Sequence, residues 1–395
     1  MSYKIKVKPE DFFVREMASV ELKQKGPYGI FILKKRGWNT LDAIKKISQK
    51  FRIPLENISY GGKKDRHATT EQFISIKDLK KDISFADENY SLKLIGFSST
   101  PMEPRLIMGN VFKIAVRDLS ESKADAIVFH LEKIKEQGFI NYFDDQRFGS
   151  YDPKQGFIGE KILKGHLNGA LKIYLTHVYP EDKKEEKERK RFFFENWSNW
   201  ELCLSRAKTN FEKMAFTHLI SKGKEFLTLL RKIPKEEMSL FFSAYQSYIW
   251  NELVRRLIEK QVDRDNLLVH RGIAGEYIFV MDADRKLIEY LKNTKVPTPS
   301  SKAKMPDDTT DRIYREILNE REITPSKFNL REIRHAFFKS VERAVLVIPE
   351  SFMYRFENDE IYEGKKKLIL AFILPRGSYA TMLIKRIFAK KIKKE

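Results

Sequence analysis

The chain has 395 residues, and its 75 lysines and arginines against 55 acidic residues give a formal net charge of +20 at neutral pH. A hydrophobic fraction of 42%, with 29 phenylalanines and 16 tyrosines, predicts a folded protein of two or three domains. The single cysteine, Cys203, excludes an intramolecular disulfide framework and any zinc or iron–sulfur site built from several cysteines. The N-terminus lacks an apolar signal-peptide core and no run is long enough to span a membrane, so we expect a soluble, cytoplasmic protein.

The excess of positive charge predicts a polyanionic partner. Such an excess concentrates polyanions around a protein, and it is the electrostatic pattern typical of nucleic-acid-binding proteins. An anionic membrane surface is the alternative that we rank second. A lysine-rich proteome would produce the same excess without a specific partner.

The N-terminal third predicts strands and one helix. Residues 3–16, YKIKVKPEDFFVRE, indicate a short strand, a turn at Pro9 and a return to extended structure. By itself this pattern is typical of an edge strand with solvated lysines. Residues 29–37 predict a strand, and residues 40–51 predict a helix with one apolar face, capped at residue 39 or 40.

Residues 59–76, SYGGKKDRHATTEQFISI, predict two strands joined by a glycine turn that carries Asp65. The basic residues around it are Lys63, Lys64, Arg66 and His67. Nearby positive charge favours the ionised form of a carboxylate, and this suits a nucleophile that must approach a polyanionic substrate. On spacing alone, an ordinary exposed hairpin is the more frequent meaning of the pattern. A phosphate-binding P-loop is excluded because GxxxxGK[ST] is absent.

The next segments predict strands at residues 90–97 and 111–116 and a helix at residues 121–137. Strands and helices mixed without regular βαβ alternation indicate an α+β fold with a largely antiparallel sheet. Residues 141–149, NYFDDQRFG, then place three aromatic rings and an arginine in nine positions. Such rings most often pack on a core, but beside a basic site a ring is also the usual platform for a flipped base.

From about Tyr151 onward, helical patterns dominate. The predicted helices cover residues 159–174, 201–214, 225–233 and 236–260. The mixed-charge run 181–191 indicates a solvated helix face or a linker, residues 269–280 a strand pair, and residues 293–311 a connection that leads back to the first domain.

The C-terminal part predicts apolar strands at residues 342–352 and 367–375, the second followed by a turn at Pro375–Gly377 and a helix to residue 387. Consecutive apolar residues in these strands predict burial on both faces.

Four segments, in this order, resemble the motifs of the TruD family of tRNA pseudouridine synthases. They are KxxPEDFxVxE from Lys6 to Glu16, GxKDxxAxTxQ from Gly62 to Gln72, NYFxxQRFG from Asn141 to Gly149, and LPxGSYATxL from Leu374 to Leu383. Asp144 departs from the family pattern, which has a glycine there, and it adds a negative charge to this loop. The run at residues 244–254 is similar to a helix of the family's inserted domain.

The resemblance implies a fold and a set of roles. It implies a pseudouridine synthase core at residues 1–150 and 311–395, interrupted by a mainly helical insertion domain at residues 151–310. It implies Asp65 as the nucleophile, with Lys6 beside it and Asn141 as its support. The implied substrate-binding residues are Phe143, which would stack on the uracil, and Phe12, Lys64, Arg66, Gln72 and Arg147.

The resemblance also implies the reaction, which is the isomerisation of a uridine in tRNA, in the family usually at position 13. We expect no cofactor and no metal, and a monomer whose basic cleft between core and inserted domain holds the tRNA backbone. Whether Asp65 attacks C1′ or the ring stays open. The alternatives are a non-catalytic RNA-binding protein or RNA chaperone and, ranked lower, a metal-dependent nuclease or phosphotransferase that uses Asp11, Asp144 and Asp145.

Overall fold

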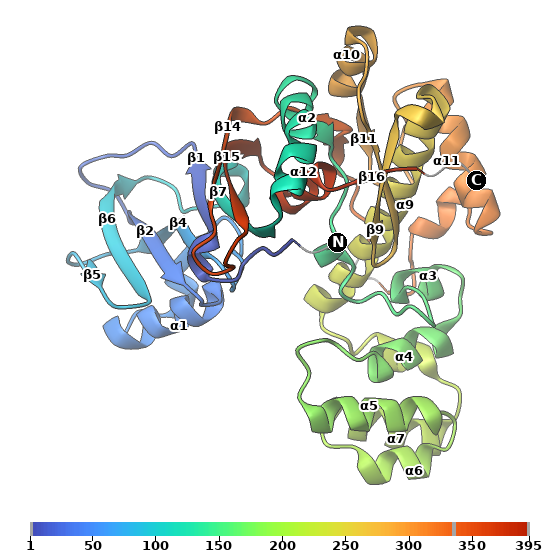
Figure 1. The fold of residues 1–395 in the computed structure, drawn as a ribbon. Helices are drawn as coiled ribbons and strands as arrows, with labels where there is room; N and C mark the ends of the chain where they lie inside the picture. Colours follow the sequence, from blue (N-terminus) through green and yellow to red (C-terminus); the bar gives the residue numbers. More distant parts are fainter. Residues whose placement is uncertain (1–2, 334–336, 393–395) are drawn as a thin grey trace. The chain divides into compact units, whose positions relative to one another are not determined.

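The structure is a computed structural model that describes residues 3–333 and 337–392 (Figure 1). Contacts within the chain divide it into two compact units. Unit 1 comprises Met1–Gly138 and Val347–Ile387, and unit 2 comprises Phe139–Leu346 and Phe388–Glu395. The chain passes between the units near the short strands β8 (Phe139–Ile140) and β13 (Leu346–Val347).

Unit 1 is built on a nine-stranded sheet of order β14-β15-β7-β1-β4-β2-β6-β5, with β3 paired to β4. Among the strand pairs of this described sheet, β1 and β4 run parallel and the others antiparallel. The predicted α+β class with a largely antiparallel sheet is confirmed. The strands are β1 (Phe12–Ala18), β2 (Tyr28–Arg36), β3 (Ile58–Tyr60), β4 (Thr69–Lys77), β5 (Phe85–Ala86), β6 (Tyr90–Ser98), β7 (Ile107–Leu119), β14 (Glu350–Asn358) and β15 (Lys366–Pro375).

Helices close this sheet where the apolar pattern predicts them. Helix α1 (Thr40–Phe51) packs Ile44 and Ile47 onto a core that includes Phe31 and Ile74 of the sheet. Helix α2 (Glu121–Gln137) has the predicted bounds and contacts β14, β15 and α12 (Ala380–Ile387). The apolar faces of these helices therefore cover the sheet, as the 3.6-residue period requires.

The burial of β15 differs from the prediction. Leu368, Leu370, Phe372 and Leu374 are buried, whereas the residues between them are only half-buried. The prediction of burial on both faces is wrong because this strand belongs to an antiparallel sheet that packs mainly through one face.

The parallel pair of β1 and β4 brings the first two motifs, at residues 6–16 and 62–72, close together. Thr69 of β4 lies opposite Phe13 of β1 and also opposite Arg36 at the end of β2. Because parallel strands begin at the same end of a sheet, the segments that precede β1 and β4 lie next to each other at that end. The last residues of antiparallel β2 lie at the same end of the sheet. Residues 4–11, the loop at residues 61–68 and Lys35 are thereby brought together.

Unit 2 is mainly helical, with the small sheet β10-β9-β16 and the pair β11-β12. Its helices are α3 (Ile158–Leu163), α4 (Leu167–Thr176), α5 (Lys184–Glu195), α6 (Trp200–Arg206), α7 (Asn210–Lys222), α8 (Phe226–Leu230), α9 (Lys235–Gln261), α10 (Arg285–Asn293) and α11 (Asp308–Glu320). Its strands are β9 (Leu267–Gly272), β10 (Gly275–Val280), β11 (Lys295–Pro297), β12 (Glu342–Ala344) and β16 (Lys390–Lys391).

Two predicted helices of unit 2 are each divided in two, so their predicted continuity is wrong. The first breaks between α3 and α4, where Gly165 has φ +74°. The second breaks between α6 and α7, where the Thr209 hydroxyl accepts from the Glu212 backbone N–H and forms a capping box that starts a new helix. Among the residues that the structure describes, no helix has the length and hydropathy needed to cross a bilayer.

Candidate active site

The end of the sheet where β1 and β4 begin brings Lys6 and Asp65 into contact. The Lys6 ammonium donates a hydrogen bond to Asp65 Oδ2, and the His67 backbone N–H donates to Asp65 Oδ1 at 2.8 Å. The two side chains are 23% and 28% exposed, so the pair is partly desolvated but open to solvent. Lys6 Nζ also lies 4.6 Å from the centre of the Phe12 ring. We call residues 61–68 the Asp65 loop.

The environment of Asp65 favours its charged form. Burial acts to raise the pKa of the carboxyl group, but the hydrogen bond and charge of Lys6, with the His67 N–H, outweigh burial and lower the pKa below its ordinary value. A carboxylate that is ionised, half-exposed and held by fixed donors is a competent nucleophile or base.

The Asp65 loop is fixed by polar side chains of the neighbouring elements. The Thr40 hydroxyl accepts from the Lys64 backbone N–H at 2.9 Å and donates to Gln72 Oε1 at 2.9 Å. Gln72 in turn donates to the Gly62 carbonyl at 3.1 Å. Lys35 donates to the Asp65 carbonyl at 2.8 Å. The main chain of the loop is therefore held at Gly62, Lys64 and Asp65 itself.

Lys64 points into the protein, not away from it. Its ammonium bonds Glu16 Oε1 at 2.5 Å and Asn110 Oδ1 at 3.2 Å, and the other Glu16 oxygen accepts from the Phe73 backbone N–H at 3.0 Å. The Lys64 side chain is only 12% exposed and Glu16 is fully buried. In this geometry Lys64 and Gln72 support the loop, and the substrate-binding role predicted for them stays a prediction.

The turn that carries Lys6 is anchored by a buried charge cluster. Arg117 donates to both oxygens of Asp11, at 2.9 and 2.8 Å, and to Asp359 at 2.8 Å. The Lys4 and Arg117 main chains exchange two hydrogen bonds. Asp11 is thus occupied by Arg117. Within residues 3–333 and 337–392, no group of three or more His, Cys, Asp or Glu side chains has an arrangement suited to a metal ion.

The aromatic segment, residues 141–149, lies in unit 2 and is organised by Arg343. Arg343 donates to the Asn141 carbonyl at 2.7 Å and to Asn141 Oδ1 at 2.8 Å, and its guanidinium lies 4.2 Å from the centre of the Phe143 ring. Asn251 exchanges two hydrogen bonds with the Phe143 main chain. Phe143 is 9% exposed and its ring meets Trp250 edge-on. The predicted roles of Asn141 and Phe143 toward Asp65 and uracil stay predictions.

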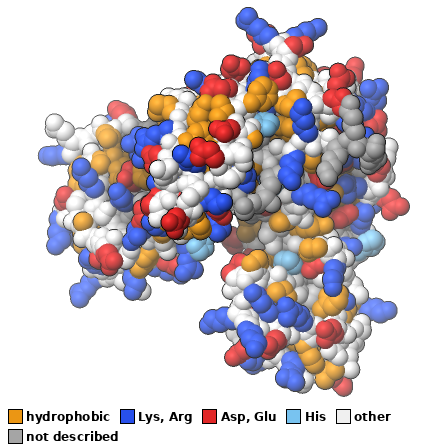
Figure 2. Space-filling model, viewed as in Figure 1, with side chains coloured by type: hydrophobic (Ala, Val, Ile, Leu, Met, Phe, Trp, Pro, Cys, Tyr) orange, Lys and Arg blue, Asp and Glu red, His pale blue; other side chains and the backbone are white. Residues whose placement is uncertain are grey.

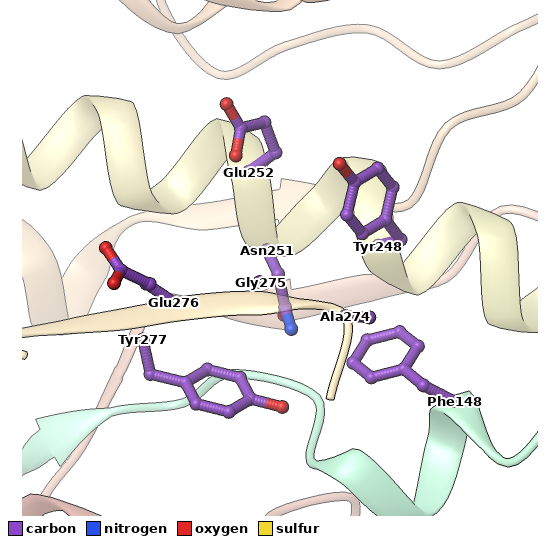
Figure 3. A pocket seen from close by; sticks show the side chains of 8 residues that line it. All are labelled: Phe148, Tyr248, Asn251, Glu252, Ala274, Gly275, Glu276 and Tyr277. Atoms are coloured by element: carbon purple, nitrogen blue, oxygen red, sulfur yellow. The ribbon is translucent and has the colours of Figure 1, made fainter. Parts of the chain in front are cut away.

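The rest of this segment is tied to α9 and β10. Arg147 donates to Ser243 Oγ at 3.4 Å, and Asp145 accepts from the Tyr277 hydroxyl at 2.8 Å. Phe148 and Tyr277 line a cavity beside α9, as Figure 3 shows.

Several supporting residues were not predicted as site residues, among them Glu16, Lys35, Asn251 and Arg343. Glu16 belongs to a recognised motif, but its partner Lys64 is distant in the chain. Lys35 stands in the run Lys34-Lys35-Arg36, where nothing local separates a buried lysine from solvated ones. Asn251 and Arg343 carry no local signal, because their partners lie 108 and 202 positions away.

Comparisons with known proteins agree on one family. The family model described as tRNA pseudouridine synthase D (TruD) matches residues 1–387. The tRNA pseudouridine synthase D of Leptospira interrogans is 34% identical over 98% of this chain and 96% of its own, and that of Aquifex aeolicus is 32% identical over the full length of both. A crystal structure from Methanosarcina mazei assigned to TruD matches with a TM-score of 0.74 and 26% identity, over 97% of this chain and 92% of that one.

These matches fall in one class of protein, the tRNA pseudouridine synthases, and they extend over both compact units. Within that class, the chain belongs to the tRNA pseudouridine synthase D (TruD) family. The resemblance first noted in four short motifs is therefore confirmed over the whole chain.

Proposed function

We propose that Asp65 is the nucleophile with which this tRNA pseudouridine synthase isomerises a uridine of tRNA to pseudouridine, and that the reaction needs no cofactor. The observation that carries the proposal is the Lys6–Asp65 pair, in which a half-exposed carboxylate is kept ionised on a firmly held loop. Family membership supplies the reaction class.

The proposed reaction begins with a uridine that leaves the base stack and presents its nucleoside to Asp65. The carboxylate forms a bond to the nucleoside, the N1–C1′ bond breaks, and the uracil turns so that C5 joins C1′. The bond between Asp65 and the nucleoside breaks before the product leaves, which restores the free carboxylate. The hydrogen at C5 is then lost to solvent as N1 gains one, so the product is an isomer of the substrate. Lys6 holds the carboxylate charged before attack and remains beside it when the covalent bond has consumed that charge.

The proposed partner is tRNA, with position 13 as the target uridine that the family suggests. Lys63 and Arg66 are exposed on the Asp65 loop and would contact phosphates there. Figure 2 shows that lysine and arginine side chains are spread widely over the visible face, which suits a substrate much larger than one nucleotide. Phe143 is the residue proposed to stack on the flipped uracil, and a monomer in the cytoplasm is the form that we expect to act.

The test is Asp65→Asn, assayed by carbodiimide mapping of pseudouridine in a tRNA transcript. We expect turnover to fall by on the order of 10³-fold or more, because the neutral amide cannot form the covalent bond, while tRNA affinity stays within about twofold. Asp87→Asn, an exposed aspartate on the same unit, is the matched control and should leave turnover unchanged.

The alternatives predict other outcomes. If the protein were only an RNA-binding protein or chaperone, the wild-type chain would form no pseudouridine and Asp65→Asn would change nothing. A metal-dependent nuclease would cleave the transcript and lose activity with a chelator. Wild-type turnover in Asp65→Asn would refute the nucleophile assignment.

A further inference from the structure

Lys35, near the end of β2, is a fully buried lysine whose ammonium contacts the Asp65 loop from the interior of the protein. Its exposed fraction is 0%. Its Nζ donates to the Asp65 carbonyl at 2.8 Å and lies 3.5 Å from the Lys64 carbonyl. Within the described part of the chain, Lys35 forms no ion pair with a carboxylate. Its hydrogen bonds go to the main chain of the two residues at the centre of the loop.

A lysine in this position is unfavourable for folding by itself. Lysine is almost never fully buried unless it is paired, because removal of its charge from water costs free energy. An apolar side chain at the same position would fill the space without that cost. A buried ammonium that faces only the carbonyls of a candidate catalytic loop therefore points to a role in activity.

The position of Lys35 is set by the sheet. It lies opposite Thr70 of β4 and Tyr90 of β6, neither of which carries an acid or a base that would be charged at neutral pH. The preceding residue, Lys34, points to the other face, is 55% exposed and pairs with Glu71 at 3.5 Å. Adjacent lysines on one strand thus have opposite environments, as the two-residue period of a strand requires.

We propose that Lys35 is a positioning residue for the reaction. Its ammonium binds the carbonyls of residues 64 and 65 from the buried side of the loop. The Asp65 carboxylate is thereby held in the position where it contacts Lys6 and would contact the substrate. This inference rests on the proposed function, because it concerns the loop that carries the proposed nucleophile. It predicts that the lysine serves turnover at the expense of stability.

The charge of Lys35 gives the inference a signature in pH. Burial lowers the pKa of Lys35 to about 8, the Asp65 charge opposes this shift and the Lys64 charge adds to it. Lys6 and His67, which bond Asp65, are the other titratable groups of the cluster. As the pH rises through about 8, the folded protein loses this charge, and a wild-type rate that depends on it should fall.

The stability of the protein should respond in the opposite direction. Below pH 8 the folded protein bears the full cost of the buried charge. Between pH 8 and the ordinary lysine value of 10.5, the folded state has released the proton and the unfolded state has not, so stability rises with pH. Lys35→Met should lack this rise.

The experiment compares Lys35→Met and Lys35→Gln with the control Lys34→Met. For each variant it measures single-turnover pseudouridine formation, tRNA affinity and thermal unfolding from about pH 6.5 to about pH 10. This range includes the pH at which the folded protein loses the Lys35 proton. We expect Lys35→Met to form pseudouridine about tenfold or more slowly at neutral pH, with tRNA affinity within about twofold and an unfolding midpoint no lower than wild type. Lys35→Gln, which keeps a donor without the charge, should be intermediate, and Lys34→Met should match wild type.

Two results would overturn the inference. The first is a wild-type rate of pseudouridine formation in Lys35→Met. The second is a Lys35→Met variant that reacts slowly, unfolds at a lower temperature than wild type and keeps the alkaline limb of the wild-type pH–rate profile. That combination would indicate a structural role alone. Failure of the proposed function is seen separately, as pseudouridine formation by Asp65→Asn. If Lys35→Met has the wild-type rate and Asp65→Asn is inactive, only the role of Lys35 is refuted.

Discussion

The Asp65 loop and the aromatic segment each carry a short motif, and polar side chains hold the main chain of both, but the surroundings of their proposed functional side chains differ. In the Asp65 loop, charged and polar side chains, among them Lys35 and Lys64, bind main-chain groups or a buried carboxylate. In the aromatic segment, Arg343 and Asn251 hold the main chain while Phe143 packs against Trp250. The carboxylate is left 28% exposed, whereas the phenylalanine is left 9% exposed.

This difference matches what each segment is proposed to do. A nucleophile needs its charge and its direction fixed before substrate arrives, and electrostatic support from several sides achieves both. A stacking ring needs only a fixed plane, which packing supplies. Substitutions in the Asp65 loop should therefore change rate and pH dependence, and substitutions in the aromatic segment should change rate and stability together.

After Asp65→Asn, the largest effect should come from Lys6→Met. Without the ammonium, burial dominates at Asp65 and its pKa rises. We expect turnover to fall on the order of 100-fold and the acid limb of the rate profile to move to higher pH. The pair's contribution to stability is present above the ordinary carboxyl pKa of 3.8 and is lost as the pH falls through the lower folded pKa, so Lys6→Met should also weaken the acid dependence of unfolding.

Lys8→Met is the control for this variant. Lys8 lies in the same segment, is 50% exposed and only approaches Glu360, at 3.9 Å. At position 6 the backbone has a positive φ of +58°. Methionine is unbranched like lysine, so the Lys6→Met substitution does not change the backbone strain there. An unchanged acid limb in Lys6→Met would show that the lysine does not set the charge of Asp65.

A smaller effect is expected for Phe143→Leu. Leucine keeps an apolar side chain next to Arg343 and Trp250 but removes the aromatic face. The free energy of unfolding should therefore fall by less than the roughly 3–5 kcal/mol that a Phe→Ala change at a buried site costs. Turnover should fall about tenfold if the ring stacks on uracil, with tRNA affinity changed less than turnover. Single-turnover assays and filter binding measure the two separately.

Phe148→Leu is the matched control within the same segment. Phe148 is 2% exposed and meets Phe157 edge-on at 6.2 Å, so it tests packing without the proposed stacking role. Equal losses of rate in Phe143→Leu and Phe148→Leu would mean that the Phe143 ring is only structural.

Local pattern predicts much of this molecule, and long-range pairing accounts for what it misses. The bounds of α2 and the β3–β4 pair follow from apolar periodicity and turn residues. The parallel contact of β1 with β4 does not, because strand pairing over more than 50 positions leaves no local signal. The same limit hid Lys35 and Arg343, whose partners are supplied by the fold. The domain division at residues 150 and 310 stays a prediction. The chain changes from one compact unit to the other after residues 138, 346 and 387.

The smallest effect should come from Arg66→Ala, and it separates two cations of one loop. Arg66 is exposed, whereas Lys64 is bound to buried Glu16. If Arg66 contacts a phosphate, its loss should weaken tRNA binding about two- to fivefold and reduce the salt slope of binding by about 1, with turnover at saturation unchanged.

Lys64→Met should behave in the opposite way. It removes no phosphate contact in the observed geometry, so the salt slope should stay constant. It leaves Glu16 buried beside β4 without its cation, so the rate should fall and the protein should unfold more easily. If Lys64→Met instead lowers the salt slope as Arg66→Ala does, then Lys64 leaves Glu16 to bind RNA, and its predicted substrate-binding role would be the correct one.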